Sequence, residues 1–327
     1  MNLMNPRSLA VLASLAVLTT PALAQVWPSR PMTLVAPTVP GGAPDLLGRV
    51  LASRLSELLG QPVIVENIGG AGGMIGAARV AKAPADGYHF LIGTVGSQAQ
   101  NQTIYKSPLY DAATDFAAVA MLWEIRYLLI VRKDLPVNDL QEFIAYARTN
   151  QASMHYGSGG VGGPLHLACA LFNAAAGLNV THVPYRGGTL ATQDLLAGRI
   201  DYMCTSAASV TGYIEAKQLK ALALLSKNRS SLMPAYATAH EQGLREFEVT
   251  GWSGLFLPKG TPAPIVNKLN AAVVGALNTP SLQARVQEAG AEIVAHDRRS
   301  PEYLQQFVET EIKKWAAVIK AAGLAGQ

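Results

Sequence analysis

Two glycine-rich loops carry the residues whose types and spacing come closest to recognisable chemistry. Residues 157–162 read Gly-Ser-Gly-Gly-Val-Gly, which fits the G-x-G-x-x-G pattern of loops that hold a dinucleotide. Residues 39–45 read Val-Pro-Gly-Gly-Ala-Pro-Asp, a bend between two prolines that is followed by an acid. Each loop follows an apolar run and precedes a helical pattern. Backbone N–H groups at such a junction bind anions, so the two loops predict an anion site.

A dinucleotide is not the expected ligand of the 157–162 loop. The strand predicted after the next helix ends at Tyr185 and is followed by Arg186, where a dinucleotide site carries an acid for the ribose. Pro164 and His166 place a helix start beside the loop, which binds an anion without a cofactor. The chain has no G-x-x-x-x-G-K-[ST] sequence, so a nucleotide site of the P-loop kind is also not expected. We therefore predict no cofactor.

The sequence shows no spacing typical of catalysis or metal binding. The residues around Ser158 lack the first glycine of a G-x-S-x-G nucleophile elbow. His166 and Cys169 are three residues apart on a predicted helix, a spacing that suits a metal or a Cys–His pair. In an exported protein, a histidine that is satisfied within the fold or lines a cleft, together with a disulfide cysteine, is the favoured interpretation. We predict a binding protein with no catalytic and no metal-binding residues; a periplasmic hydrolase using Ser158 or His166 is an alternative.

Asp45 has two roles open to it. Pro44 suits the first position of a helix, and a carboxylate in the first turn interacts favourably with the helix dipole, by about 0.3–1 kcal/mol. Alternatively, the Asp45 carboxylate meets a cationic or hydroxyl group of a ligand or fixes an ordered water. The two roles are compatible.

The N-terminal residues have the pattern of a secretory signal peptide. Arg7 precedes an apolar stretch at 9–18, and Ala22-Leu23-Ala24 forms a small-x-small cleavage pattern. The apolar stretch is too short to cross a hydrocarbon core, which needs roughly 20 residues. We expect cleavage after Ala24 and a mature protein in the periplasm. The formal net charge is +4 and the basic residues are scattered, so nucleic acid is not an expected partner.

Short apolar runs alternate with amphipathic helical patterns along the chain, which predicts an α/β fold with parallel strands and crossover helices. Strands are predicted at 33–36, 63–65, 89–93, 128–131, 154–156, 181–185, 200–204 and 221–225. The glycine loops fall at the carboxyl ends of strands, the edge of an open sheet at which ligands bind. The helical pattern from Glu302 onward is expected to return to the first part of the fold.

This pattern predicts two open α/β lobes joined by crossing strands, with a cleft between them. The expected division is a signal peptide at 1–24, a discontinuous first lobe at 25–124 plus 248–327, and a second lobe at 125–247.

The two cysteines, Cys169 and Cys204, fall on a predicted helix and at the end of a predicted strand. In an oxidising compartment they can pair, which stabilises a fold by roughly 3–4 kcal/mol in the chain-entropy model. Two buried free thiols are the alternative, because the sequence does not fix their geometry.

A series of segments in fixed order resembles one family. The segments are 40–45 with Arg49, 65–67 with the glycines at 70, 72, 73 and 76, 80–88, 182–187, 194–196 with Asp201, and 254–262. Over nearly the whole mature chain they resemble the solute-binding receptors of tripartite tricarboxylate transporters, also called Bug receptors. Val39 stands where the family often has an aromatic residue, which predicts a wider pocket. Ile68-Gly69 and Met74 also depart from the common pattern, and these differences leave the ligand's identity open.

The resemblance implies a periplasmic two-lobed receptor of the Venus-flytrap, type II-like class, which closes on a small carboxylate and delivers it to membrane permease subunits. In such receptors the loop at 38–45 cradles one carboxylate through backbone amides and ordered waters. The facing lobe contributes the loop at 158–162 and the strand end near Thr205 and Ser206. The implied ligands are dicarboxylates, aromatic carboxylates and acidic amino acids, and the receptor is expected to be a monomer. A sensor subunit that signals to a membrane kinase would use the same closure.

Together these arguments give one set of candidate ligand-binding residues. They are Thr38, Val39, Pro40, Gly41, Gly42, Asp45, Thr94, Ser97, Ser158, Gly159, Gly162, His166, Thr205 and Ser206.

Overall fold

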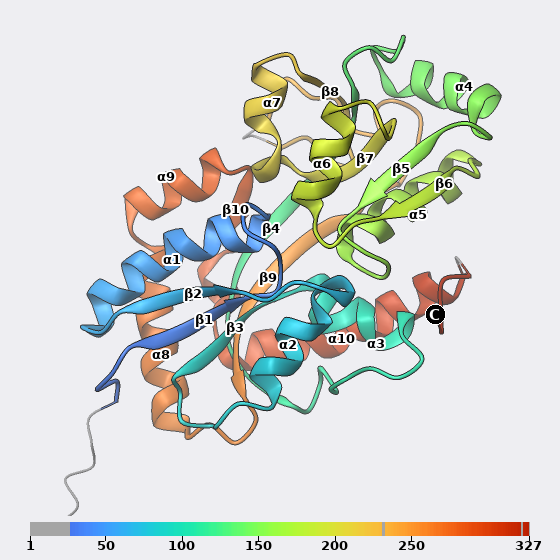
Figure 1. Ribbon diagram of the computed structural model, residues 1–327. Coiled ribbons are helices and arrows are strands. Elements are labelled where there is room, and N and C mark those ends of the chain that lie inside the picture. The colour runs from blue at the N-terminus through green and yellow to red at the C-terminus, as the bar shows by residue number, and fades with distance from the viewer. Residues whose placement is uncertain (1–26, 231–232, 322, 327) are drawn as a thin grey trace, which may run out of the picture.

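The chain folds into two α/β lobes that share one mixed sheet (Figure 1). The computed structural model describes residues 27–230, 233–321 and 323–326. The predicted signal peptide and its cleavage site lie outside the described residues. Among the helices that are described, none combines the length and apolarity needed to cross a bilayer.

The first lobe is built on three parallel strands in the order β2-β1-β3, and the sheet continues through β9 to β4. Its strands are β1 (Met32–Ala36), β2 (Val63–Asn67), β3 (His89–Thr94), β9 (Thr250–Pro258) and β10 (Ala291–Ile293). Its helices are α1 (Ala43–Leu59), α2 (Met74–Ala81), α3 (Asn101–Ile104), α8 (Ala263–Leu277), α9 (Pro280–Glu288) and α10 (Pro301–Ala321).

The second lobe repeats the scheme around the parallel strands β6-β5-β7. Its strands are β5 (His155–Ser158), β6 (Thr181–Pro184), β7 (Tyr202–Ser206) and β8 (Leu219–Leu224). Its helices are α4 (Leu140–Asn150), α5 (Pro164–Ala176), α6 (Gly188–Leu196) and α7 (Thr211–Glu215).

Two long strands connect the lobes: β4 (Phe116–Arg132) carries the chain from the first lobe to the second, and β9 brings it back (Figure 1). Because they run in opposite directions they pair antiparallel, and β4 also pairs antiparallel with β7, β8 and β10. The expectation of parallel strands is therefore correct for β2-β1-β3 and β6-β5-β7 and wrong for the crossing strands and for β8 and β10, which pair with β4. The predicted strand at 128–131 is only the last part of β4.

The crossing strand β4 is buried on both faces in the second lobe. Leu129 and Val131 belong to the main core of the molecule, whereas Leu128 and Ile130 belong to a smaller core under α6. This alternation follows from the two-residue period of a strand. Such strands read as continuous apolar runs, which is why the sequence did not reveal where β4 begins.

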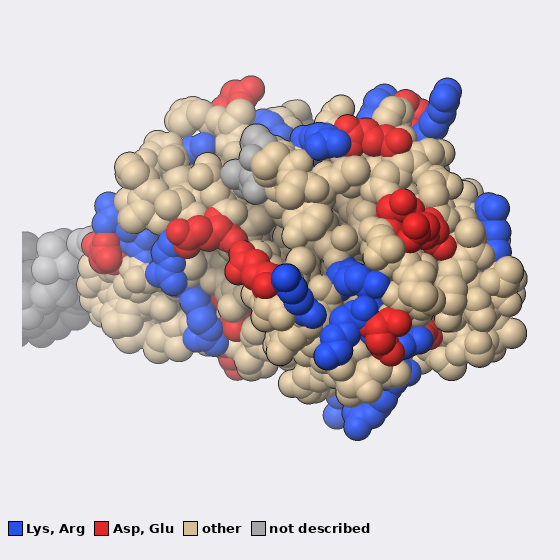
Figure 2. Space-filling model, turned by 90° about the horizontal axis from the view of Figure 1, so that it is seen from above, with Lys and Arg blue, Asp and Glu red and all other residues tan. Residues whose placement is uncertain are grey.

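The C-terminal helix α10 lies against β4 and against the π-helical turn at Gly96–Gln100 in the first lobe. The last helix thus returns to the first lobe, while the exact lobe boundaries stay a prediction. On the face seen in Figure 2, acidic and basic side chains lie interspersed over the surface and form no patch of a single sign.

Candidate ligand-binding site

A cavity of about 100 Å³ lies between the lobes. Loops of the first lobe form one wall, loops of the second lobe form the opposite wall, and Ile125, Tyr127, Trp252 and Ser253 of the crossing strands also line it. The space is large enough for several waters or for a small organic molecule.

Four helices begin at this cavity, and each has a glycine as its N-cap. The N-cap residues are Gly42 for α1, Gly73 for α2, Gly163 for α5 and Gly187 for α6, and all four line the cavity. None of these helices has a side-chain hydrogen bond at its cap. The first backbone N–H groups of a helix lack intrahelical partners, and the helix dipole adds partial positive charge at this end. Helix starts from both lobes therefore surround one site that suits an anion.

The side chains around the cavity supply hydroxyl donors and one cation. Hydroxyls come from both lobes and from the crossing strands: Thr38, Thr94, Tyr127, Thr189, Thr205, Ser206, Ser209 and Ser253. Burial raises the pKa of the Tyr127 phenol, which keeps the hydroxyl protonated as a donor. Among the described residues of the lining, Arg186 is the one charged side chain, and it is largely exposed.

Ser253 is the most unusual of these hydroxyl residues. Its side chain is fully buried, it lines the cavity, and its Oγ has no hydrogen-bond partner within the described structure. A buried hydroxyl without a hydrogen-bond partner lowers the stability of the fold by about 1–3 kcal/mol. The Ser253 hydroxyl is therefore suited to donate a hydrogen bond to a molecule in the cavity.

The two lobes touch across the cavity. Thr189 Oγ1 of the second lobe donates to the carbonyl oxygen of Pro40 in the first, at 3.2 Å. Tyr105 of the first lobe donates to the carbonyl oxygen of Val161 at 2.7 Å. Gly187 lies so close to the Val39 side chain that a Cβ at Gly187 would be 2.3 Å from Val39 Cγ2. The structure thus shows the lobes closed against each other.

The structure places the predicted site residues in two groups. Thr38, Gly42, Thr94, Gly159, Thr205 and Ser206 line the cavity. The other eight do not belong to the lining: Val39, Pro40, Gly41, Asp45, Ser97, Ser158, Gly162 and His166. Val39 packs between the lobes, and Ser97 Oγ accepts a hydrogen bond from the backbone N–H of Thr94 at 3.0 Å. Most of these eight residues support the loops whose backbone forms the wall of the cavity.

Asp45 holds the first glycine loop in shape. Its carboxylate accepts from Gly41 N–H at 2.8 Å and from Asn67 Nδ2 at 2.9 Å, and it forms an ion pair with Arg49 at 2.9 Å. Burial works against ionisation, but these three donors outweigh it and hold the pKa of the Asp45 carboxyl below its usual value. The carboxylate is therefore committed to the protein, as a support for the cavity wall.

Replacing Asp45 by asparagine should lower the free energy of unfolding at pH 7 by about 1–3 kcal/mol, because buried hydrogen bonds to a charged group are lost. The folded pKa of Asp45 lies below that of the unfolded chain. Its stabilisation is thus present above about pH 4 and is lost as the pH falls through the folded pKa. Urea unfolding should therefore show a smaller gap between wild type and Asp45→Asn in acid than at pH 7.

The matched control for this change is Asp134→Asn, since Asp134 forms an exposed ion pair with Arg132. Exposed pairs contribute about 0–1 kcal/mol, so this variant should unfold almost like the wild type. If Asp45→Asn behaved like the control at pH 7, its carboxylate would not be supporting the loop.

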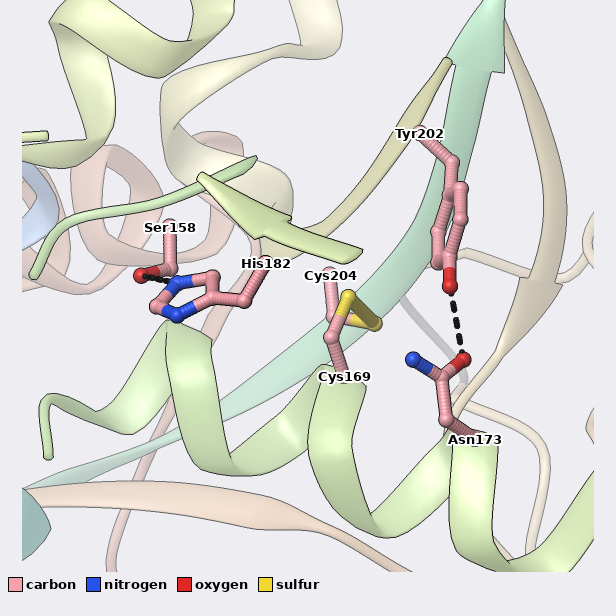
Figure 3. The surroundings of a disulfide bond; sticks show 6 residues. All are labelled: Ser158, Cys169, Asn173, His182, Tyr202 and Cys204. Atoms are coloured by element: carbon pink, nitrogen blue, oxygen red, sulfur yellow. Dashed lines mark hydrogen bonds between the residues drawn. A yellow bond between two sulfur atoms is a disulfide. The ribbon is translucent and has the colours of Figure 1, made fainter. Parts of the chain in front are cut away.

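The buried His166 and the half-buried His182 stack under the second glycine loop. The rings of His166 and His182 have centroids 4.1 Å apart, and Tyr156 stacks on His182 at 4.8 Å. His182 Nε2 lies 2.7 Å from Ser158 Oγ (Figure 3), and His166 Nδ1 accepts from Gly162 N–H at 3.2 Å. Burial lowers the pKa of His166 to about 4, and burial together with the neighbouring His166 lowers that of His182 to about 3. Both rings are therefore neutral at physiological pH.

A disulfide between Cys169 and Cys204 joins α5 to β7, with a Cα–Cα distance of 5.2 Å (Figure 3). The start of α5 and the end of β7, at Thr205 and Ser206, both line the cavity. The bond therefore ties together two elements that supply the wall of the second lobe.

Sequence reasoning did not assign the residues that the crossing strands and the 186–189 loop bring to the cavity. Tyr127 follows Arg126 at the start of an apolar run and Ser253 lies between Trp252 and Gly254, and no local motif marks either residue as a ligand contact. The available signal was topological, because a strand that passes between two lobes must face the cleft at its middle. Arg186 and Gly187 directly follow a predicted strand and could have been chosen on that ground.

In the part of the chain that the structure describes, no group of three or more His, Cys, Asp or Glu side chains is arranged to hold a metal ion.

Comparisons with known proteins agree with this geometry. The model of the tripartite tricarboxylate transporter family receptor matches residues 47–324. A protein from Agrobacterium vitis, encoded in the TAR-I ttuE-ttuC' intergenic region, is 38% identical over 98% of this chain and 92% of its own length. BugT from Bordetella pertussis is 31% identical over 96% of both chains.

Solved structures of similar proteins have the same fold. The periplasmic binding protein BugD superposes with a TM-score of 0.89 at 35% identity, covering 92% of this chain and 100% of its own. MatC from Rhodopseudomonas palustris, with bound malate, gives 0.86 at 35% identity over 90% and 100%. A second R. palustris protein, with adipate, gives 0.88 at 38% identity over 92% and 100%. The chain belongs to the receptor family of the tripartite tricarboxylate transporters, whose members include the Bug solute-binding proteins.

Proposed function

We propose that this protein is an exported, periplasmic receptor that captures a small dicarboxylate between its lobes and delivers it to membrane permease subunits. The observation that carries the proposal is the ring of four glycine-capped helix starts around one cavity. Free N–H groups at a helix start bind carboxylates as well as phosphates. The signal-peptide pattern, with its expected cleavage after Ala24, supports export.

A ligand with two carboxylates fits the arrangement better than one with a single charge. The glycine-capped starts of α1, α2, α5 and α6 surround the cavity, while the exposed Arg186 offers a cation at its edge. One carboxylate would accept from the helix starts and from Ser253, and the other would meet Arg186. The similar proteins that contain malate and adipate support the same class of ligand. Aromatic carboxylates and acidic amino acids stay within the proposed range.

Capture without chemical conversion fits the position of Ser158. Its side chain is fully buried, does not line the cavity, and is hydrogen-bonded to His182 and to Gly160. A nucleophile must reach the reacting atom of its substrate, and Ser158 supports a loop instead. Recovery of a bound ligand unchanged after long incubation is the corresponding test.

A thermal-unfolding screen tests the proposed ligand class. Succinate, malate, adipate and glutarate should stabilise the protein, by about 2.7 kcal/mol at 100 times the dissociation constant. The matched controls are the corresponding neutral diamides, which keep shape and length but lack charge and should not stabilise. Stabilisation by a sugar or a polyamine, with none from any carboxylate, would overturn the proposal.

Delivery to a permease is tested separately, by uptake. Deleting the gene should abolish uptake of the ligand found in the screen, and restoring it should recover the transport. Normal uptake in the deletion strain would point instead to a sensor role.

A further inference from the structure

The floor of the ligand cavity is formed by strands of the central sheet, and its polar groups carry no charge. Four hydroxyl residues lie across it, from β3 to β9, β4 and β7: Thr94, Ser253, Tyr127 and Ser206. Thr94 pairs with Ser253 in the sheet, and Tyr127 pairs with Ser206. Arg186, the one charged side chain among the described residues of the lining, belongs to the loop that precedes α6. The floor therefore offers hydrogen bonds without charge.

Two of these four hydroxyls are engaged within the protein. Thr94 Oγ1 accepts a hydrogen bond from the backbone N–H of Ser97 at 3.3 Å, and Ser206 Oγ lies 3.1 Å from the hydroxyl of a neighbouring serine. The hydroxyls of Tyr127 and Ser253 have no hydrogen-bond partner within the described structure. Tyr127 is 5% exposed and Ser253 is fully buried, so bulk water does not satisfy them either. Both hydroxyls are suited to bond with a molecule in the cavity.

The Tyr127 phenol is placed by a glycine on the neighbouring strand. The ring extends from β4 across β9, where a Cβ at Gly251 would lie 2.4 Å from Tyr127 Oη and 2.9 Å from Cζ. The bare backbone of Gly251 leaves room for the phenol. Gly251 and Ser253 are two residues apart on β9 and face the same side of the sheet. The Tyr127 hydroxyl therefore lies on the face that carries Ser253, closer to the second lobe.

The surroundings of Tyr127 favour a neutral group of the ligand. A buried carboxylate needs a cation or several donors around it, and the helix starts and Arg186 supply these along the walls of the cavity. A neutral hydroxyl or keto oxygen needs only one hydrogen bond, which a phenol can donate. In the proposed binding mode both carboxylates are met by other groups. What faces Tyr127 is the carbon chain between them.

We propose that Tyr127 is a specificity-determining residue, whose hydroxyl bonds to a neutral oxygen substituent on the carbon chain of the ligand. The receptor then selects dicarboxylates with a hydroxyl or keto group beside a carboxylate over unsubstituted acids of the same length. An unsubstituted acid leaves the buried phenol unpaired, and sites with an unpaired polar group reject such analogues. The inference rests on the proposed capture of a dicarboxylate and narrows that class.

Calorimetry on the wild type with two matched pairs of acids measures the selection. Malate is compared with succinate, and 2-oxoglutarate with glutarate, because the members of each pair have the same chain length and the same two carboxylates. The substituted acid of each pair should bind about 5- to 100-fold more tightly, the range expected for one buried hydrogen bond and an unpaired partner.

Three variants assign the preference to one hydroxyl. Tyr127→Phe keeps the ring on Gly251 and should reduce the preference within each pair to about twofold or less, by weakening the substituted acids alone. Ser253→Ala should weaken both members of each pair alike, since Ser253 is proposed to donate to a carboxylate. Tyr202→Phe is the control for stability. It removes a buried tyrosine hydroxyl outside the cavity, bonded to Asn173 at 2.7 Å, and should leave the preference unchanged (Figure 3).

The outcomes separate this inference from the proposed function. A Tyr127→Phe variant that kept the preference would show the inference to be wrong. Equal weakening of both members of each pair would do the same, since Tyr127 would then contact a carboxylate or only shape the cavity. Binding of all four acids by the wild type without preference would refute the inference and leave the proposed function standing. Binding of none of them would refute the proposed ligand class, and this inference with it.

Discussion

An alanine at Gly187 is expected to weaken binding of the dicarboxylate ligand about 5- to 150-fold while the ligand-free protein keeps its stability. A Cβ at this position would lie 2.3 Å from Val39 Cγ2 and 3.0 Å from Cγ1, across the contact between the lobes. Valine is stiff about its first side-chain torsion and cannot turn away. Overpacking of this kind costs about 1–3 kcal/mol, and that cost falls on the closed form, because opening the lobes separates the two loops.

The backbone conformation at Gly187 can accept alanine without strain. Its φ of 161° is extended and open to any residue, so alanine introduces a contact and no backbone strain. Calorimetry on the single variants and on Val39→Ala/Gly187→Ala measures the coupling, since removing the valine methyl groups should restore most of the affinity. If the double variant bound no better than Gly187→Ala, or if Gly187→Ala destabilised the ligand-free protein equally, the contact would not belong to closure.

The same contact changes the expectation for Val39. An aromatic residue there would meet the 187 loop before it met the ligand, so it should hinder closure and not merely reshape the cavity.

The second large effect concerns acid. The free energy of unfolding should fall as the pH drops below about 6.5. The reason is that His166 and His182 become protonated in the unfolded chain while they stay neutral in the folded chain. The folded pKa values are lowered to about 4 and about 3, so this loss continues down to that range and then levels off. The two residues together should contribute a slope approaching about 2.7 kcal/mol per pH unit near pH 5.

Urea unfolding between pH 7 and pH 4.5 tests this linkage. His166→Phe/His182→Phe keeps two aromatic rings in the stack and should show a flatter pH dependence than the wild type. The control is the exposed His296, whose replacement by asparagine should leave the slope unchanged. All three proteins carry the same acidic residues, so equal slopes would show that the histidine pair accepts protons without unfolding.

The sequence was sufficient for the local structure and for the part of the site that consists of backbone. The alternation of apolar runs and helical patterns predicted the parallel strands of each lobe but not α7, α9 or β10, and the glycine loops pointed to Gly42, Gly159 and their neighbours. It was insufficient where both faces of a strand are buried, as in β4, because a continuous apolar run gives no period from which to read a boundary or a facing direction.

The side chains show the same division. Asp45, Ser158 and His166 were chosen because their chemistry is reactive, yet their polar atoms are bonded within the protein and support loops. Tyr127 and Ser253 were not chosen, because no local motif marks them. Whether a polar group faces a ligand or its own chain depends on contacts between residues far apart in the sequence, and local patterns do not carry that information.

The glycine caps have a consequence for how such a receptor can change. Its anion donors are main-chain N–H groups, which every substitution except one by proline leaves in place as long as the helix starts keep their shape. The selective part of the cavity, by contrast, consists of replaceable side chains such as Tyr127, Arg186 and Ser253. Mutation can therefore exchange one ligand for another while the capacity to bind a carboxylate is inherited intact, so that new specificities arise without passing through an inactive receptor.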